Sequence, residues 1–256
     1  IVDEEAYAKG GQIILVEDVL ATLQKLANFH RKFLHIPIIG LTGSNGKTTT
    51  KELIYAVLKT SYKSKATPGN LNNHIGVPLT LLSFGSDTEI GIVEMGANHQ
   101  KEIEFLSNIA EPDFGYITNF GKAHLEGFGG IEGVIKGKSE LYDFLKTHKK
   151  TAFVNPDDEK QVELTAGINR IFFDKDFEIL EVHPFLKIGF EDTIIETQLI
   201  GSYNIPNLMA AITIAKYFKI SNTAIKEAIS NYLPNNNRSQ IVEKRQNKIL
   251  LDAYNA

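Results

Sequence analysis

The segment 40–50 contains the residue types, at the spacing, that hold a phosphate group. It reads Gly-Leu-Thr-Gly-Ser-Asn-Gly-Lys-Thr-Thr-Thr, after an apolar run at 35–39 and before a helical pattern at 51–58. Backbone amides between glycines and at a helix N-terminus attract anions, because their dipoles point at the ligand. The pattern predicts a phosphate-binding loop, in which Lys47 contacts the outer phosphates of a nucleotide and Thr48 presents its hydroxyl to Mg²⁺.

The loop is a variant of the common pattern Gly-x4-Gly-Lys-Thr. That pattern requires glycine where this chain has Leu41, and the glycines fall at positions 40, 43 and 46 instead. Glycine-rich turns usually have a purely structural reason, so a turn without a ligand is the alternative. The succession Gly46-Lys47-Thr48 between a predicted strand and a predicted helix favours nucleotide binding.

Two candidate metal ligands follow later strands. Glu94 ends the apolar run 90–93, and a carboxylate there can hold the magnesium that bridges nucleotide phosphates. The alternative is that Glu94 caps the next helix. His124 lies after the predicted strand 113–118, where a neutral imidazole can bind a divalent ion. The alternative there is a histidine that only forms hydrogen bonds within its loop.

Lys138 has an unusual place on the predicted helix 130–146. It lies four residues after Val134 and four before Tyr142, in the middle of the apolar stripe, whereas Glu140 falls on the solvent flank. A buried, unpaired ammonium group is costly. Either the stem of Lys138 extends to an edge, where the charge meets water, or the amine is held for chemistry with a lowered pKa.

Apolar runs alternate with helical patterns along the chain. The predicted strands are 36–41, 89–95, 113–118, 151–154 and 170–173, and the predicted helices are 47–59, 100–108, 130–146, 204–219 and 222–231. Alternating residues over 177–199 predict a small antiparallel β element. We therefore expect an α/β fold, with a mostly parallel sheet flanked by helices and ligands at the carboxyl ends of the strands.

The two ends of the chain are expected to belong to neighbouring domains. Residues 1–34 contain a strand candidate at 12–16 and an amphipathic helix after it, and they resemble a connecting piece. The asparagines at 235–237 have the composition of a linker, and 240–252 reads as two strands that open another domain. Because the chain starts without methionine and stops after a strand, we expect a segment of a longer polypeptide.

Composition excludes several classes of protein. The 256 residues carry a net charge of −4, which argues against a general basic surface for nucleic acid. The absence of cysteine excludes disulfides and thiol chemistry. No apolar run approaches the ~20 residues that cross a bilayer, and we expect a cytoplasmic protein.

Together these motifs resemble those of the ATP-dependent Mur ligases of peptidoglycan synthesis. The similar segments are 40–50, Thr-Pro-Gly-Asn-Leu-Asn-Asn at 67–73, Glu-Met-Gly-Ala-Asn-His at 94–99, Ala-His-Leu-Glu-Gly-Phe at 123–128, the helix lysine Lys138, and the pair Asn204 and Asn207. Within the family they are most similar to the ligases that add D-alanyl-D-alanine to UDP-N-acetylmuramoyl tripeptide. Tyr203 departs from the histidine that is common in the family, and this departure affects the adenine contact.

The resemblance implies three domains and a set of site residues. Residues 1–34 would end the domain for the uridine nucleotide and connect it, 35–237 would bind ATP, and 238–256 would begin a truncated C-terminal domain. Implied catalytic residues are Lys47, His124 and Lys138, the last carbamylated. Implied nucleotide contacts are Gly43, Ser44, Asn45, Gly46, Lys47, Thr48, Thr49, Asn204 and Asn207, and implied Mg²⁺ contacts are Thr48, Glu94, His124 and Lys138.

The implied reaction is amide formation through an acyl phosphate, with ATP, UDP-N-acetylmuramoyl tripeptide and D-alanyl-D-alanine as reactants. We expect a monomer, and we expect the 256 residues alone to be inactive because domain closure completes such sites. The alternatives are another Mur-type or folylpolyglutamate-type ligase, or a nucleotide-binding module without catalysis. The sequence offers no Asn-Lys-x-Asp segment for guanine, which argues against a GTPase.

Overall fold

The apolar run before the glycine loop forms strand β1 (Ile38–Thr42), all of whose residues are buried. A strand covered on both faces is typical of the centre of a parallel sheet. Side chains alternate between the faces: Ile39 and Leu41 pack in one hydrophobic cluster and Ile38 in the other. The computed structural model describes residues 1–174, 177–234, 240–245 and 247–251.

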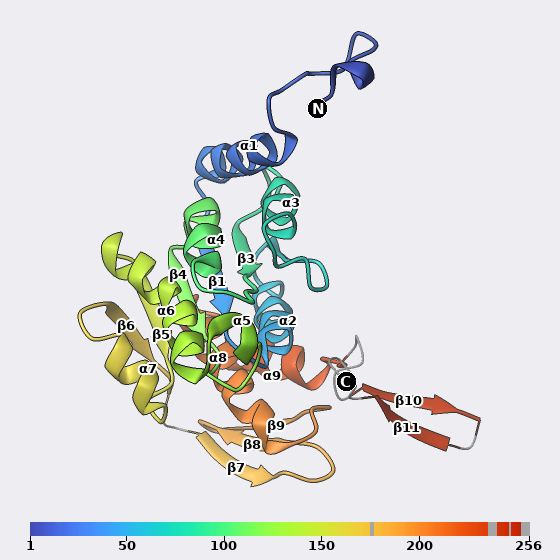
Figure 1. Ribbon diagram of the computed structural model, residues 1–256. Helices are drawn as coiled ribbons and strands as arrows, with labels where there is room; N and C mark the ends of the chain where they lie inside the picture. The colour runs from blue at the N-terminus through green and yellow to red at the C-terminus, as the bar shows by residue number, and fades with distance from the viewer. Residues whose placement is uncertain (175–176, 235–239, 246, 252–256) are drawn as a thin grey trace.

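Six parallel strands form the central sheet, with β1 inside it (Figure 1). The other five are β2 (Ser64–Ala66), β3 (Ile90–Glu94), β4 (Phe114–Ile117), β5 (Thr151–Val154) and β6 (Asn169–Phe172). Their order is β2-β3-β1-β4-β5-β6, so β1 lies between β3 and β4. The carboxyl ends of these three strands therefore meet at one edge of the sheet, where ligands of such sheets bind.

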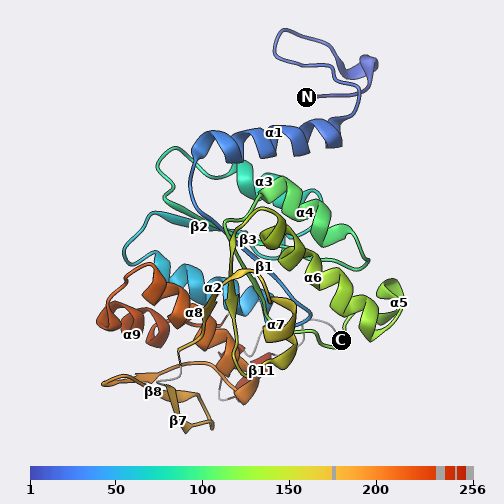
Figure 2. The same cartoon turned by 90° about the vertical axis from the view of Figure 1, so that its left-hand side faces the viewer.

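Helices cover both faces of the sheet (Figure 2). One face carries α2 (Lys47–Leu58), α8 (Ile205–Tyr217) and α9 (Asn222–Ser230), and the other carries α3 (Gly76–Leu82), α4 (Glu102–Ala110) and α6 (Ile131–Thr147). Shorter helices are α5 (Leu125–Phe128) and α7 (Glu159–Leu164), with 3₁₀ turns at Glu5–Tyr7 and Ser202–Asn204. None of the described helices combines the length and apolar composition of a membrane span.

Two antiparallel elements complete the described part of the chain. Strands β7 (Phe177–Glu181), β8 (Lys187–Phe190) and β9 (Thr193–Glu196) form a three-stranded sheet, and α9 packs on β9. Strands β10 (Gln240–Lys244) and β11 (Asn247–Leu251) form a hairpin. The predicted α/β fold and its small antiparallel element are confirmed. The asparagine run at 235–237 and the segment 252–256 lie outside the described residues.

One predicted strand is wrong. Within 12–16, only Leu15 forms a bridge, and its partner is Val2. Ile13, Ile14 and Leu15 are substantially exposed, so no strand or helix of the described residues covers them. An apolar run predicts that its side chains are buried, but it does not show which segment of the chain would cover them.

The helix predicted next is α1 (Val19–Leu34), which begins with Asp18 accepting a hydrogen bond from the amide of Ala21. It packs against α3 and α4. The three domain boundaries proposed from the sequence stay a prediction.

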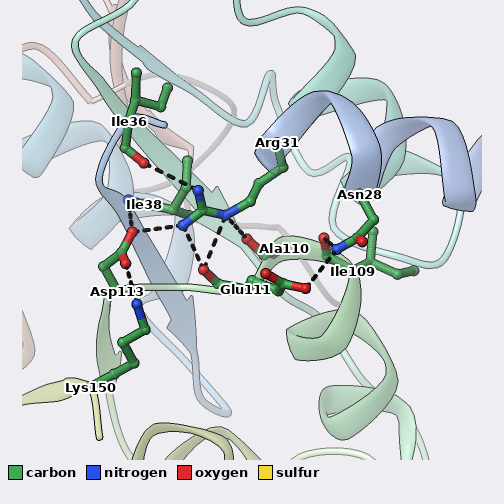
Figure 3. Close-up of polar contacts among 9 residues, drawn as sticks. All are labelled: Asn28, Arg31, Ile36, Ile38, Ile109, Ala110, Glu111, Asp113 and Lys150. Carbon is green, nitrogen blue, oxygen red and sulfur yellow. Dashed lines mark hydrogen bonds and ion pairs between the residues drawn. The ribbon is translucent and has the colours of Figure 1, made fainter. Parts of the chain in front are cut away.

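Arg31 fastens α1 to the amino-terminal edge of the sheet (Figure 3). Its guanidinium group donates to the carbonyl oxygens of Ala110 and Glu111, and an Nη atom lies 2.7 Å from Asp113 Oδ2. The same carboxylate accepts the amide of Ile38, the first residue of β1. This network ties α1, the end of α4 and the starts of β1 and β4 together.

We expect Arg31→Met to lower the free energy of unfolding by about 3 kcal/mol, because it removes a buried charge with several partners. The control is Lys32→Met at the next position. Lys32 forms an exposed ion pair with Glu111, which contributes about 1 kcal/mol or less. Urea denaturation of both variants measures the difference, and equal losses would contradict this role of Arg31.

Candidate nucleotide-binding site

The glycine loop joins the end of β1 to the start of α2, as the sequence predicted. Gly43 has φ +140° and Gly46 has φ +79°, conformations that favour glycine. A Cβ on Gly43 would lie 2.0 Å from Thr118 Oγ1, and one on Gly46 would lie 2.7 Å from Asn207 Oδ1. Both glycines are therefore required by backbone conformation and by close neighbours.

The loop is tied to the segment that follows β4. The side chain of Asn119 pairs with the backbone of Asn45: its Oδ1 accepts the Asn45 amide at 3.1 Å and its Nδ2 donates to the Asn45 carbonyl at 3.0 Å. The Ser44 hydroxyl donates to the carbonyl of Gly121. No role was assigned to Asn119 from the sequence, although its place directly after a strand was a usable signal.

The ammonium group of Lys47 lies over the loop. Its Nζ donates to the carbonyl oxygens of Gly43 at 2.8 Å and Ser44 at 3.2 Å. The Lys47 charge is thus held beside the loop amides, where it would meet the outer phosphates of a nucleotide.

Glu94 lies at the end of β3, opposite the start of α2. The hydroxyl of Thr48 is 3.1 and 3.0 Å from its two carboxylate oxygens, and Asn72 Nδ2 donates to Oε1 at 2.8 Å. Glu94 is 1% exposed. The alternative in which Glu94 caps the next helix is wrong, because the carboxylate of Glu102 accepts the amides before α4.

Lys138 is buried in α6, with 1% of its surface exposed. Its Nζ donates to the carbonyl of Ala97 at 3.1 Å and lies 5.0 Å from the ring centre of Phe128. Burial, together with the charge of Lys47, lowers the pKa of Lys138 to about 7. The alternative in which the stem carries the charge to solvent is wrong.

Glu140 is also buried, and the prediction that it faces solvent is wrong. Its carboxylate accepts the backbone amides of Lys101 at 2.6 Å and Glu104 at 3.0 Å, at the N-terminus of α4. Acidic groups are favourable at a helix N-terminus. The apolar stripe of α6 does not predict this contact, because the N-terminus of α4, which Glu140 caps, is distant in sequence.

His124 is exposed, in contrast to Lys138. It has φ 54° and precedes α5. Partial desolvation and the charges of Lys138 and Lys47 lower the pKa of His124, which favours the neutral imidazole that can bind a metal ion.

Asn204 and Asn207 form a buried network behind the glycine loop. Asn207 Oδ1 accepts the hydroxyl of Thr50 at 2.9 Å, and Asn207 Nδ2 donates to Asn204 Oδ1 at 2.9 Å. Asn204 precedes α8, and its side chain makes no capping hydrogen bond. The network links α8 to α2 and supports the loop at Gly46.

A cavity of about 670 Å³ brings most of the predicted site residues together. Its lining includes Ser44, Asn45, Gly46, Lys47, Thr48, Thr49, Glu94, His124, Asn204 and Asn207, as well as Tyr203. Gly43 and Lys138 are not among the lining residues. Ala97, whose carbonyl accepts the hydrogen bond of Lys138, does line the cavity. Loop amides suit phosphates, and the oxygen donors of Thr48 and Glu94 suit Mg²⁺.

The fold and the cavity are those of an α/β domain whose glycine loop, at the carboxyl edge of a parallel sheet, suits the phosphates of a nucleotide. The family model of the Mur ligase middle domain matches residues 41–215. The chain belongs to the Mur ligase family.

Relatives of known sequence give the same result. The chain is 36% identical over 255 residues to the UDP-N-acetylmuramoyl-tripeptide–D-alanyl-D-alanine ligase of Bacillus subtilis, covering 95% of this chain and 55% of the relative. With the corresponding Escherichia coli ligase it is 31% identical over 260 residues, covering 95% and 57%. The chain thus spans little more than half the length of these relatives. The predicted resemblance to Mur ligases that add D-alanyl-D-alanine is confirmed.

Solved structures agree in fold. A crystal structure of MurF from Acinetobacter baumannii has a TM-score of 0.83 and 28% identity, covering 97% of this chain and 58% of that one. MurF ligase from Thermotoga maritima, in complex with ADP, has a TM-score of 0.80 and 30% identity, covering 96% and 60%.

The buried amine of Lys138 has a measurable consequence. Its pKa is about 7 in the folded chain and 10.5 in its ordinary state, so the unfolded chain binds more protons between these values. The free energy of unfolding should therefore rise with pH across that interval. In CO₂-free buffer, we expect the free energy of unfolding to increase between pH 7 and pH 9, and to increase less in Lys138→Met. Urea denaturation measures it, and equal rises in both proteins would contradict a neutral buried amine.

Proposed function

We propose that the whole protein is an ATP-dependent ligase, and that this chain is its ATP-binding part. The ligase joins UDP-N-acetylmuramoyl tripeptide to D-alanyl-D-alanine in peptidoglycan precursor synthesis. The observation that carries the proposal is the meeting of the glycine loop, Lys47 and the Thr48–Glu94 pair in one cavity. Membership of the Mur ligase family and the names of the relatives support it.

The reaction has two steps. A carboxylate oxygen of the tripeptide attacks the γ-phosphorus of ATP, the bond to the β,γ-bridging oxygen breaks, and ADP leaves. The amine of D-alanyl-D-alanine then attacks the acyl carbon of the acyl phosphate, phosphate leaves, and an amide remains after loss of a proton. Loop amides and the Lys47 ammonium position the phosphates and stabilise the negative charge that moves during transfer.

Thr48 and Glu94 would hold one Mg²⁺ beside the outer phosphates, because a hydroxyl and a carboxylate are oxygen donors of the kind it prefers. A second ion would be held by His124 and by Lys138 in its carbamylated form. The neutral amine of Lys138 can add to the carbon of CO₂ and lose a proton, which leaves a carbamate anion. Bound Mg²⁺ neutralises phosphate charge during the transfer.

Asn204 and Asn207 are proposed to lie near the adenine. Both line the cavity, and so does Tyr203, which replaces the histidine common in the family. The side chains of the two asparagines already have partners within the protein. We therefore assign them a supporting position beside the base. We also propose that the enzyme is cytoplasmic and monomeric, and that it acts on small molecules and not on nucleic acid.

Lys47→Ala should abolish ATP-dependent phosphate release by the full-length protein in the presence of the tripeptide substrate and D-alanyl-D-alanine. The physical reason is loss of the cation beside the phosphates. Lys59→Ala, at the exposed end of the same helix, is the control and should retain activity. Release by Lys47→Ala near the wild-type rate would refute the loop assignment. A panel of amino-acid and dipeptide acceptors separates this ligase from others of the family.

The 256-residue chain alone should bind ATP in the presence of Mg²⁺ and form no amide. Binding needs only the cavity described above, whereas ligation needs both carboxylate and amine to be held against it. Isothermal titration with ATP and mass spectrometry of the reaction mixture measure the two properties. Amide formation by this chain would contradict the expectation.

A further inference from the structure

Lys51 is a fully buried lysine that the proposed mechanism does not use. It lies on α2, four residues after Lys47 and three after Thr48, so the three side chains share a face of the helix. Its exposed fraction is 0%. A buried ammonium group is costly unless its donors are satisfied, which raises the question of what the charge holds in place.

The partners of Lys51 come from outside its helix as well as from within it. Nζ donates to the carbonyl oxygens of Thr67 and Gly69, both at 2.7 Å. It also lies 3.0 Å from a carboxylate oxygen of Glu52 and 3.8 Å from Glu94 Oε2. The two short bonds to carbonyls are at the start of the segment 67–75, which we call the pocket loop.

The pocket loop contacts Glu94 at two points. The hydroxyl of Thr67 accepts the Glu94 amide at 2.9 Å, and Asn72 Nδ2 donates to the Glu94 carboxylate. The carbonyl of Asn72 also accepts the amide of Gly96, just beyond β3. Asn72, Asn73 and His74 line the cavity. The pocket loop, to which Lys51 is hydrogen-bonded, thus lines the cavity and also holds the Glu94 carboxylate by hydrogen bonds.

We propose that Lys51 is a positioning residue: it fixes the pocket loop to α2, so that Asn72 holds the Glu94 carboxylate in place for Mg²⁺ and nucleotide. The inference rests on the proposed function insofar as Glu94 serves Mg²⁺. Thr48 contacts Glu94 from α2 directly, whereas Lys51 acts on it both as an ion pair at 3.8 Å and through the pocket loop. One helix therefore sets both sides of the carboxylate.

The first test measures the loop without any ligand. Hydrogen exchange of the 256-residue chain should show about tenfold faster exchange of the 67–75 amides in Lys51→Met, with β1 and β4 unchanged, because local opening of the loop becomes easier. Lys216→Met is the matched control. Lys216 pairs with Asp174 at 2.6 Å, neither residue lines the cavity or belongs to the pocket loop, and loss of this pair should leave 67–75 unchanged.

The second test measures binding of a fluorescent ATP analogue with Mg²⁺ and with EDTA. Lys51→Met should weaken binding about tenfold in Mg²⁺, a typical effect of losing a group that orients a metal ligand, and less than about twofold in EDTA. Asn72→Ala should have a similar effect. Both substitutions act through Glu94. The double variant should therefore bind the analogue no more weakly than whichever single variant binds it less tightly.

The outcomes separate the two proposals. Unchanged exchange of the pocket loop in Lys51→Met, or additive effects of the two substitutions, would overturn the role of Lys51. If the wild-type chain bound the analogue equally well in Mg²⁺ and EDTA, the Mg²⁺ assignment would fail while the exchange result still decided the role of Lys51. If Lys51→Met did not fold, Lys51→Gln, whose amide group keeps two N–H donors but no charge, should show the same changes to a smaller degree. Failure of both to fold, while Lys216→Met folds, would make Lys51 a folding residue and overturn the proposal.

Discussion

The site depends on one buried carboxylate, that of Glu94 at the end of β3. A charge with 1% exposure is stable only if donors surround it, and here they come from Thr48 on the phosphate-loop helix and Asn72 on the pocket loop. These partners lie 46 and 22 residues away in sequence. Satisfying one charge therefore fixes the positions of three chain segments around the cavity.

The two edges of the parallel sheet differ in what their charged groups contact. At the amino edge, the Arg31 guanidinium gathers carbonyl oxygens and Asp113, and this binds α1 to the starts of β1 and β4. At the carboxyl edge, residues of the glycine loop and Lys47 line the cavity. One edge is closed by protein partners, whereas the other presents cationic and dipolar groups to a ligand. This asymmetry suits a domain that binds a polyphosphate at one edge of its sheet.

Several predictions from the sequence were accurate because they depended on local pattern. The strand, glycine loop and helix around Lys47 follow from neighbouring residues, and the place of Lys138 on the apolar face of its helix follows from helical periodicity. The errors concern partners distant along the chain. Glu140 was assigned to solvent because the helix end that it caps could not be seen from its own helix. The apolar run at 12–16 was assigned to a strand, although within the described residues it forms only one isolated bridge.

By itself the sequence determined the class of fold, the phosphate loop and the residue types of the candidate site. These depend on interactions within a few residues, which periodicity and spacing record. Only the tertiary structure decided three contacts. Asn119 hydrogen-bonds to the backbone of the glycine loop, Asn207 accepts a hydrogen bond from Thr50 on α2, and Lys51 donates to a carbonyl oxygen of the pocket loop. The reason is that a side chain's partner across the sheet depends on how distant segments pack, and no local pattern carries that information.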